Sequence, residues 1–334
     1  MSQVIASNVL ANGLRTEFAD TYLKVRQKQA DSRVGQIMDL GISAWNRQHE
    51  FAYFEAAPHM ELWRRGDTIP SDAFGSVKFT AYVYEWAKRV KWSKFDRADD
   101  QTQSLFDAAR AAGESAALLP ERFLFDLLNN SSSLITTIPA VPTAPDGVSL
   151  FSATDAVSGN RFGVSGGNLL SGAGVSTTAA VLSDYYKVVA RFMNMQDGKG
   201  QPLHSPEALA AGVYVICSAT DIQVMEQTFL QKLQGMNPGG TYAAGVSNVI
   251  QDSGKNVELW ASPRLATGDW YVVMKNAPKK PFFLMDRDGL KTMTSLEGDN
   301  NSDHTRNTGE EYIQFEMRQG AAPALPYAII KVDN

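Results

Sequence analysis

The sequence predicts an α+β fold. Several segments place apolar residues at helical spacing, and several shorter segments are dense in the β-branched and aromatic residues that favour strands. The two kinds of segment follow one another without the regular rhythm of βαβ units, which is typical of an α+β protein. With 334 residues, the chain is long enough for about two or three units with a core of their own, and it contains no internal repeat.

The first expected helical region covers residues 14–40. Leu14, Phe18 and Tyr22 lie at helical spacing among charged residues, so we predict one or two amphipathic helices here. The next stretch, residues 44–58, is rich in aromatic side chains. These rings need a surface on which to pack.

Residues 60–92 predict a long hairpin. Turn-forming residues, among them Pro70 and Gly75, precede a stretch that is dense in Val, Phe, Tyr and Trp. Side chains of a strand alternate between two faces, and neither face of this strand is fully polar. Four apolar residues share one face, namely Val77, Phe79, Ala81 and Val83.

Two helices are expected after the hairpin. Residues 101–115 repeat apolar side chains at helical spacing, and the preceding Asp99 and Asp100 suit the positive N-terminal end of a helix. Pro120 suits the first turn of a second helix over residues 121–130. Together they predict one long, kinked helix. The segment that follows, up to residue 176, is rich in Ser, Gly and Thr, and we expect a functional loop or a boundary there.

Periodic patterns return in the second half of the chain. Residues 177–195 and 220–233 have helical spacing, and we expect Thr220 or Asp221 to cap the second helix. The segments predicted to be strands are residues 213–217, 257–261, 270–274, 281–285, 312–317 and 327–332.

Charge and cysteine content limit the class of protein. The formal charge is −5, from 31 basic and 36 acidic residues, which is too balanced for a protein that coats nucleic acid. The single cysteine, Cys217, cannot form a disulfide within the chain, as is typical of a reducing compartment. Residues 1–13 do not resemble a secretory signal, and the most apolar stretch, residues 208–219, is shorter than the roughly 20 residues of a membrane-spanning helix. We expect a soluble intracellular protein.

The sequence shows no pattern typical of a cofactor or metal site. Phosphate-loop and dinucleotide motifs are absent, and the four histidines lack metal-ligand spacing. Cys217 lies in an apolar run, which favours a buried and unreactive thiol. Residues 163–167 match the form of a nucleophile elbow centred on Ser165, but the surrounding Gly- and Ser-rich sequence favours a flexible loop.

Basic residues gather around the predicted hairpin. The cluster consists of Arg64, Arg65, Lys78, Lys88, Arg89, Lys91, Lys94 and Arg97. Interleaved with aromatic residues, these side chains could grip a nucleic-acid backbone, dock on an acidic surface of a neighbouring copy, or simply be solvated. Because residues 101–334 carry more acidic than basic side chains, we favour self-association.

Five short segments and the order of the predicted elements resemble a known family. The segments are ELWRRGDTIP at 61–70, KFDRADDQ at 94–101, DGKGQPL at 197–203, DWYVV at 269–273 and KKPFF at 279–283. From about Leu14 onward, the chain resembles tailed-phage major capsid proteins, whose fold is named after phage Hong Kong 97. More narrowly, it resembles the Mu-like major head subunit family.

The resemblance implies a division into four parts. Residues 1–59 would be an N-terminal arm, residues 60–93 an extended β-hairpin loop, residues 94–176 and 289–334 a peripheral domain with a long spine helix, and residues 177–288 an axial domain near a symmetry axis. The arm and the hairpin would contact neighbouring subunits. The expected interface residues are Trp63, Arg64, Arg65, Lys78, Lys88, Arg89 and Lys91.

The resemblance also implies a structural protein without catalytic residues, cofactors or metal. Its copies would form the pentamers and hexamers of an icosahedral shell around double-stranded DNA, with weak, non-specific contact to the DNA. Separate scaffolding, portal and decoration proteins are expected partners, and no membrane is involved. The protein would be located in the virion after assembly in the cytoplasm of a bacterial host.

Two other classes of protein remain as alternatives. The first is an enzyme, either a hydrolase that uses Ser165 or one whose site combines remote residues such as Asp286, Arg287, His304 and Glu310. The second is a nucleic-acid-binding module that uses the basic hairpin.

Overall fold

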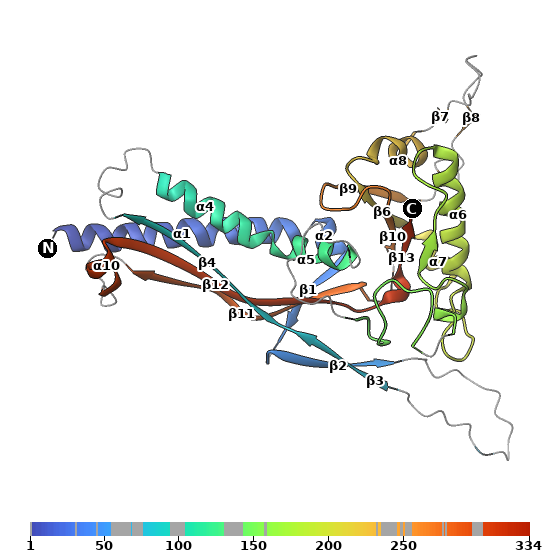
Figure 1. The fold of residues 1–334 in the computed structure, drawn as a ribbon, viewed down its shortest axis with the longest axis horizontal. Helices are drawn as coiled ribbons and strands as arrows, with labels where there is room; N and C mark the ends of the chain where they lie inside the picture. Colours follow the sequence, from blue (N-terminus) through green and yellow to red (C-terminus); the bar gives the residue numbers. More distant parts are fainter. Residues whose placement is uncertain are drawn as a thin grey trace. The chain divides into compact units, whose positions relative to one another are not determined.

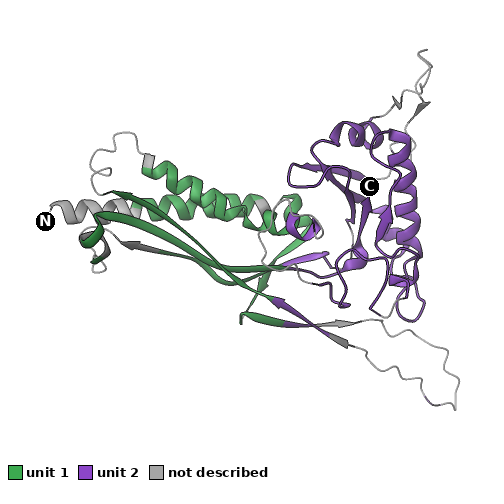
Figure 2. Cartoon of the chain, viewed as in Figure 1, with its two compact units in different colours: residues 1–49, 82–124, 284–321 green, residues 50–81, 125–283, 322–334 purple. Residues whose placement is uncertain are grey.

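A computed structural model shows two compact units (Figure 2). Unit 1 comprises residues 1–49, 82–124 and 284–321, and unit 2 comprises residues 50–81, 125–283 and 322–334. The structure describes residues 2–30, 32–44, 46–54, 68, 76–93, 104–129, 143–156, 159–231, 233–234, 246–247, 250, 256–275, 277, 279–295 and 303–334.

Unit 1 combines helices with a four-stranded sheet (Figure 1). Its helices are α1 (Ser2–Ala30), α2 (Arg33–Ile37), α4 (Ser104–Ala117), the first part of α5 (Leu119–Leu128) and α10 (Asp303–Thr308). The strand order is β1 (Met38–Ser43), β11 (Phe282–Ser295), β12 (Glu310–Pro323) and β4 (Tyr84–Ser93), so that β4 lies at one edge of the sheet. β4 and β12 are antiparallel along their length, from Tyr84 opposite Gln319 to Ser93 opposite Glu310.

The core of unit 1 lies between α1, α4 and the sheet. Leu14 and Phe18 of α1 are fully buried, and the Phe18 ring stacks on Phe315 of β12 with 3.6 Å between the ring centroids. α1 and α4 cross closely at Gly113, where a Cβ atom would lie only 2.9 Å from the Phe18 carbonyl oxygen. The apolar spacing at residues 14–22 therefore packs α1 on its own chain, although these residues fall in the predicted N-terminal arm.

Unit 2 is built on a five-stranded sheet. The strand order is β5 (Leu169–Ser171), β13 (Ile329–Asp333), β10 (Trp270–Met274), β6 (Val213–Ser218) and β9 (Val257–Ser262). β10 is antiparallel to both of its neighbours, whereas β9 is parallel to β6 and β5 is parallel to β13. Helices α6 (Thr178–Asn194) and α8 (Ile222–Phe229) cover one face, with Val181, Val188 and Phe229 in a core that includes alternate residues of β6 and β10.

The remaining described elements of unit 2 are short. They are α7 (Pro206–Ala210), β7 (Leu233–Gln234), β8 (Val246–Ser247) and the 3₁₀ turns η1 (Arg161–Gly163) and η2 (Pro326–Ala328). The predicted helix over residues 177–195 is confirmed by α6, where the Thr177 hydroxyl accepts a hydrogen bond from the amide of Ala180. Helix α8 follows Asp221, but the expected cap is not formed, because the Asp221 carboxylate accepts a hydrogen bond from the amide of Gly268 instead. Helices and sheets without a regular βαβ alternation confirm the α+β class, although α8 lies between the parallel strands β6 and β9 in the chain. None of the described helices is both long and apolar enough to cross a membrane.

The observed hairpin pairs β2 (Gln48–Phe54) with β3 (Ser76–Tyr82). The predicted faces are confirmed, because Phe79, Ala81 and Val83 are buried while Tyr82 is exposed. Phe51 of β2 packs against Phe79 and Phe283, and this contact gives the aromatic stretch its packing surface. The expected turn around residues 70–75 lies outside the described residues.

The hairpin differs from the predicted one at both ends. It begins at Gln48 instead of residue 60, because the aromatic stretch itself supplies the first strand. It ends near Tyr82, because β4 pairs with β12 and thus belongs to the sheet of unit 1. At the C-terminus, β12 and β13 lie in different sheets, so residues 322–334 belong to unit 2 and not with residues 289–321.

Candidate functional site

The structure divides the expected interface residues between the two units. Lys78 lies on β3, whereas Lys88, Arg89 and Lys91 lie on β4. The other three expected residues, Trp63, Arg64 and Arg65, lie outside the described residues. The basic cluster is therefore not one continuous surface of the hairpin in the part of the chain that the structure describes.

Lys78 forms a cross-strand ion pair within the hairpin. Its Nζ atom lies 2.8 Å from Oε2 of Glu50, and both side chains are exposed. The hydrogen bond from Lys78 lowers the pKa of the Glu50 carboxyl. Exposed pairs of this kind are screened by water and salt and contribute little to stability, so Lys78 is accessible for contacts with another molecule.

Arg89 and Lys91 lie on the solvent-facing side of β4 and contact β12. Nε and Nη2 of Arg89 donate to Oε1 of Gln314 at 3.0 and 2.5 Å, and the guanidinium lies 4.1 Å from the centre of the Tyr312 ring. Lys91 Nζ lies 3.2 Å from Oε2 of Glu310. These basic groups take part in a cross-strand network on the exposed side of β4 and β12.

Lys88 points to the opposite side of β4. It shares that side with Trp86 and Val90 and lies opposite Phe315 of β12, since alternate residues of a strand face the same way. This side borders an open groove of about 600 Å³ between the sheet and α4. The groove is lined by Phe18, Trp86, Ala87, Lys88, Val90, Ala108, Ala111, Ala112, Ser115, Ala116, Leu119, Arg122, Phe315 and Met317.

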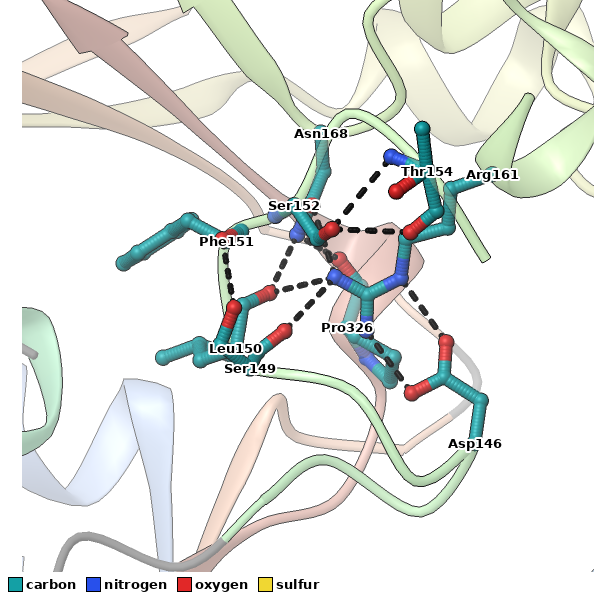
Figure 3. A network of polar contacts seen from close by, with 9 residues as sticks. All are labelled: Asp146, Ser149, Leu150, Phe151, Ser152, Thr154, Arg161, Asn168 and Pro326. Carbon is teal, nitrogen blue, oxygen red and sulfur yellow. Dashed lines mark hydrogen bonds and ion pairs between the residues drawn. The ribbon is translucent and has the colours of Figure 1, made fainter. Parts of the chain in front are cut away.

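A buried arginine organises the segment before β5, where the sequence shows no periodic pattern (Figure 3). Arg161 is 1% exposed, and its Nε and Nη2 atoms donate to the two carboxylate oxygens of Asp146 at 2.8 and 2.9 Å. Nη1 of Arg161 donates to the carbonyl oxygens of Ser149 and Leu150 and to Oδ1 of Asn168. The guanidinium thus joins both ends of the loop.

Asn168 links the same loop to the C-terminal part of unit 2. Its side chain is fully buried, and Nδ2 donates to the carbonyl oxygens of Leu150 at 2.8 Å and Pro326 at 3.0 Å. The ring of Phe151 in this loop packs against Tyr271 on the face of the sheet opposite α6 and α8. Sequence reasoning missed this network, and its only signal was an isolated arginine in a Gly- and Ser-rich segment.

The structure contradicts the proposed catalytic arrangements. Ser165 is exposed and lies between η1 and β5, without the preceding strand and following helix that a nucleophile elbow requires. Asp286 and Arg287 are adjacent in β11 and point to opposite faces. Asp286 accepts a hydrogen bond from Gln319, and Glu310 lies nine residues before Gln319 in β12, about 30 Å away at the rise of a strand.

The nucleophilic and metal-binding groups of the described residues also fit a structural role. Cys217 is fully buried in β6, and burial raises the pKa of its thiol to about 12, so the reactive thiolate is disfavoured. Burial lowers the pKa of His204, whose Nε2 lies 2.9 Å from the Tyr327 carbonyl oxygen. No group of His, Cys, Asp and Glu side chains among the residues that the structure describes could hold a metal ion. The side chain of His304 lies outside them.

Comparisons with known proteins agree on one family. A model of the family described as phage capsid protein matches residues 77–332. No curated protein matches the chain with significance.

Solved structures with a similar fold include capsids of phages. The capsid of cyanophage P-SCSP1u is 12% identical with a TM-score of 0.53, and the similarity covers 89% of this chain and 86% of that one. The structure described as Mycobacterium phage Patience is 12% identical with a TM-score of 0.54, covering 96% and 87% of the two chains. The mature capsid of bacteriophage PhiM1 is 9% identical with a TM-score of 0.54, covering 90% and 86%.

Proposed function

Because the chain belongs to the phage capsid protein family, we propose that its copies assemble into the icosahedral head that encloses the double-stranded DNA of a tailed phage or prophage. The family match carries this proposal, since it extends over most of the chain. The role of the protein is structural, and the shell is built from many copies of it. Within the family, the order of segments favours a Mu-like major head subunit.

Extended contacts between subunits would hold the shell together. We assign the hairpin of β2 and β3, including the sequence around Trp63, Arg64 and Arg65, to contacts with an adjacent subunit. Lys78 supports this assignment because it is exposed and held only by a weak surface ion pair. Many modest contacts of this kind sum to a stable closed assembly.

The two compact units fit the two domains that the resemblance implies. Unit 1, with its long helices and sheet, would be the peripheral domain, and α4 with α5 would be the spine helix, kinked at Leu118. Unit 2, with the five-stranded sheet, would be the axial domain around the symmetry axes of pentamers and hexamers. Residues 125–176 and 322–334 would then belong to the axial and not to the peripheral domain.

We further propose separate scaffolding, portal and decoration proteins as partners, and only weak, non-specific contact with the packaged DNA. The net charge of −5 fits a shell that encloses DNA without coating it tightly. The protein would be located in the virion after assembly in the host cytoplasm.

Expression of the chain together with its scaffolding protein, followed by electron microscopy, tests the proposal. We expect closed shells from the wild type. A variant with Arg64→Glu and Arg65→Glu should yield folded subunits that do not form shells, whereas Arg287→Glu, at an exposed position on β11, should assemble normally. Undiminished shell formation by the double variant would contradict the role of the hairpin.

A further inference from the structure

We propose that the groove between β4 and α4 receives helix α8 of a second copy of this chain, with Glu226 of that copy facing Lys88 and Arg122. This interface rests on the proposed function, because it requires copies that assemble. It joins two different surfaces, one from unit 1 and one from unit 2, and does not involve β2 or β3.

The groove has the form of a packing site that none of the described residues fills. Its helical wall consists of small side chains, among them Ala108, Ala112 and Ala116, which permit a close approach of another backbone. Its other wall is the apolar side of β4, with Trp86 and Val90. The helical wall from Ala108 to Leu119 extends over about 17 Å at the rise of an α-helix, which is long enough for a short helix to lie along it.

The charges of the groove select the chemistry of its occupant. Lys88 and Arg122 line it, whereas no carboxylate is among the described residues of its lining. Arg122 donates from Nη2 to Ser115 at 3.2 Å, while its Nε is buried and has no hydrogen-bond partner among the described residues. A carboxylate between two apolar side chains would satisfy both cations and fill the apolar walls.

Helix α8 presents this pattern on its exposed side. Ile222 and Leu230, at the start and just after the end of the helix, are 36% and 45% exposed. Glu226 lies midway between them and is also exposed. Spacings of four residues place all three on one side of a helix, over about 12 Å. Neither Glu226 nor Lys88 has an ion-pair partner in the described part of the chain, so both charges are available.

A second copy is the occupant that fits best. Copies of the chain surround one another in a shell, so α8 is present at high local concentration. Contact between two different surfaces is heterologous, and repeated rotation by the same angle closes such contacts into a ring. A small apolar ligand fits less well, because the groove is open and lacks the convergent polar groups that orient ligands in pockets.

A charge exchange tests the pairing. Lys88→Glu and Glu226→Lys should each raise the protein concentration needed for shell formation by about tenfold, because each places like charges together. The double variant restores an opposite-charge pair between positions 88 and 226, so it should recover much of the loss, although Arg122 then faces a cation. Circular dichroism before assembly verifies that each subunit is folded, and Arg287→Glu, at an exposed position on β11, is the matched control.

Crosslinking gives a second readout that does not depend on yield. Ala111→Cys and Leu230→Cys subunits, mixed before assembly and treated with a short bismaleimide, should give covalent dimers. Cys217 is buried and should not react. Subunits that carry Ser183→Cys, at an exposed position on α6, in place of Leu230→Cys should give no covalent dimers.

The outcomes separate this proposal from the proposed function. If the wild type forms no shells with its scaffold, the proposed function fails. If shells form while neither single charge reversal changes assembly and no dimers appear, the docking of α8 is refuted and the proposed function stands. Failure of the double variant to recover, together with specific dimers, would overturn the pairing of Lys88 with Glu226.

Discussion

Replacing Arg161 by methionine should destabilise unit 2 by about 3 kcal/mol. The substitution removes both ion-pair contacts to Asp146 and three further hydrogen bonds, and it leaves the buried carbonyl oxygen of Leu150 with one donor fewer. Breaking a buried ion pair from one side costs about 3–5 kcal/mol. The lower end of this range applies to Arg161→Met, because Asp146 is 22% exposed and water can solvate the carboxylate that remains.

Thermal unfolding of the unassembled subunit, followed by calorimetry, measures this cost. For a unit of this size, about 2–4 °C per kcal/mol corresponds to a fall in Tm of about 6–12 °C. Arg161→Lys should lie between the wild type and Arg161→Met, since a lysine retains the charge but not the forked geometry. Arg287→Met, at an exposed position, is the control. A Tm for Arg161→Met within about 1 °C of the wild type would refute the role of the network.

Three further predictions concern the cores and the thiol. Phe18→Ala should lower the free energy of unfolding of unit 1 by about 3–5 kcal/mol in chemical denaturation, because it removes a buried ring stacked on Phe315; a loss below about 1 kcal/mol would count against this packing. Gly113→Val should force α1 away from α4 and increase hydrogen exchange in α1, whereas Ser115→Ala should not. Cys217 should resist alkylation in the folded protein at pH 8 and react on unfolding. Because burial raises the pKa of the thiol, the unfolded chain ionises first, so the free energy of unfolding should fall as the pH rises above about 9. Rapid labelling of the native protein would contradict its burial.

The sequence predicted helices and strands better than it predicted which strands pair. The helix of residues 178–194 and the strand of residues 213–218 were identified from local patterns, because apolar spacing acts within one segment. The alternation in β3 also predicted its buried face. The α+β class followed from the order of such segments.

Pairing between distant segments was beyond local patterns. Nothing in residues 84–93 indicates that their partner is β12 and not the other arm of the hairpin, since the same alternation suits either. The separation of β12 from β13 into two sheets was missed for the same reason.

The candidate site shows the same limit at the level of single side chains. Lys88, Arg89 and Lys91 were grouped by charge, although alternation within the strand places Lys88 on the side of Trp86 and Val90. This alternation of side chains was present in the sequence. The contacts of Arg161 were not, because its partners come from separate turns of a segment without periodicity.

Electron microscopy of particles formed when the chain is expressed with its scaffolding protein tests the central claim most directly. The account predicts closed icosahedral shells whose wall density is fitted by this fold, with pentamers and hexamers of the chain. Particles that contain the scaffolding protein but not this chain would contradict the claim.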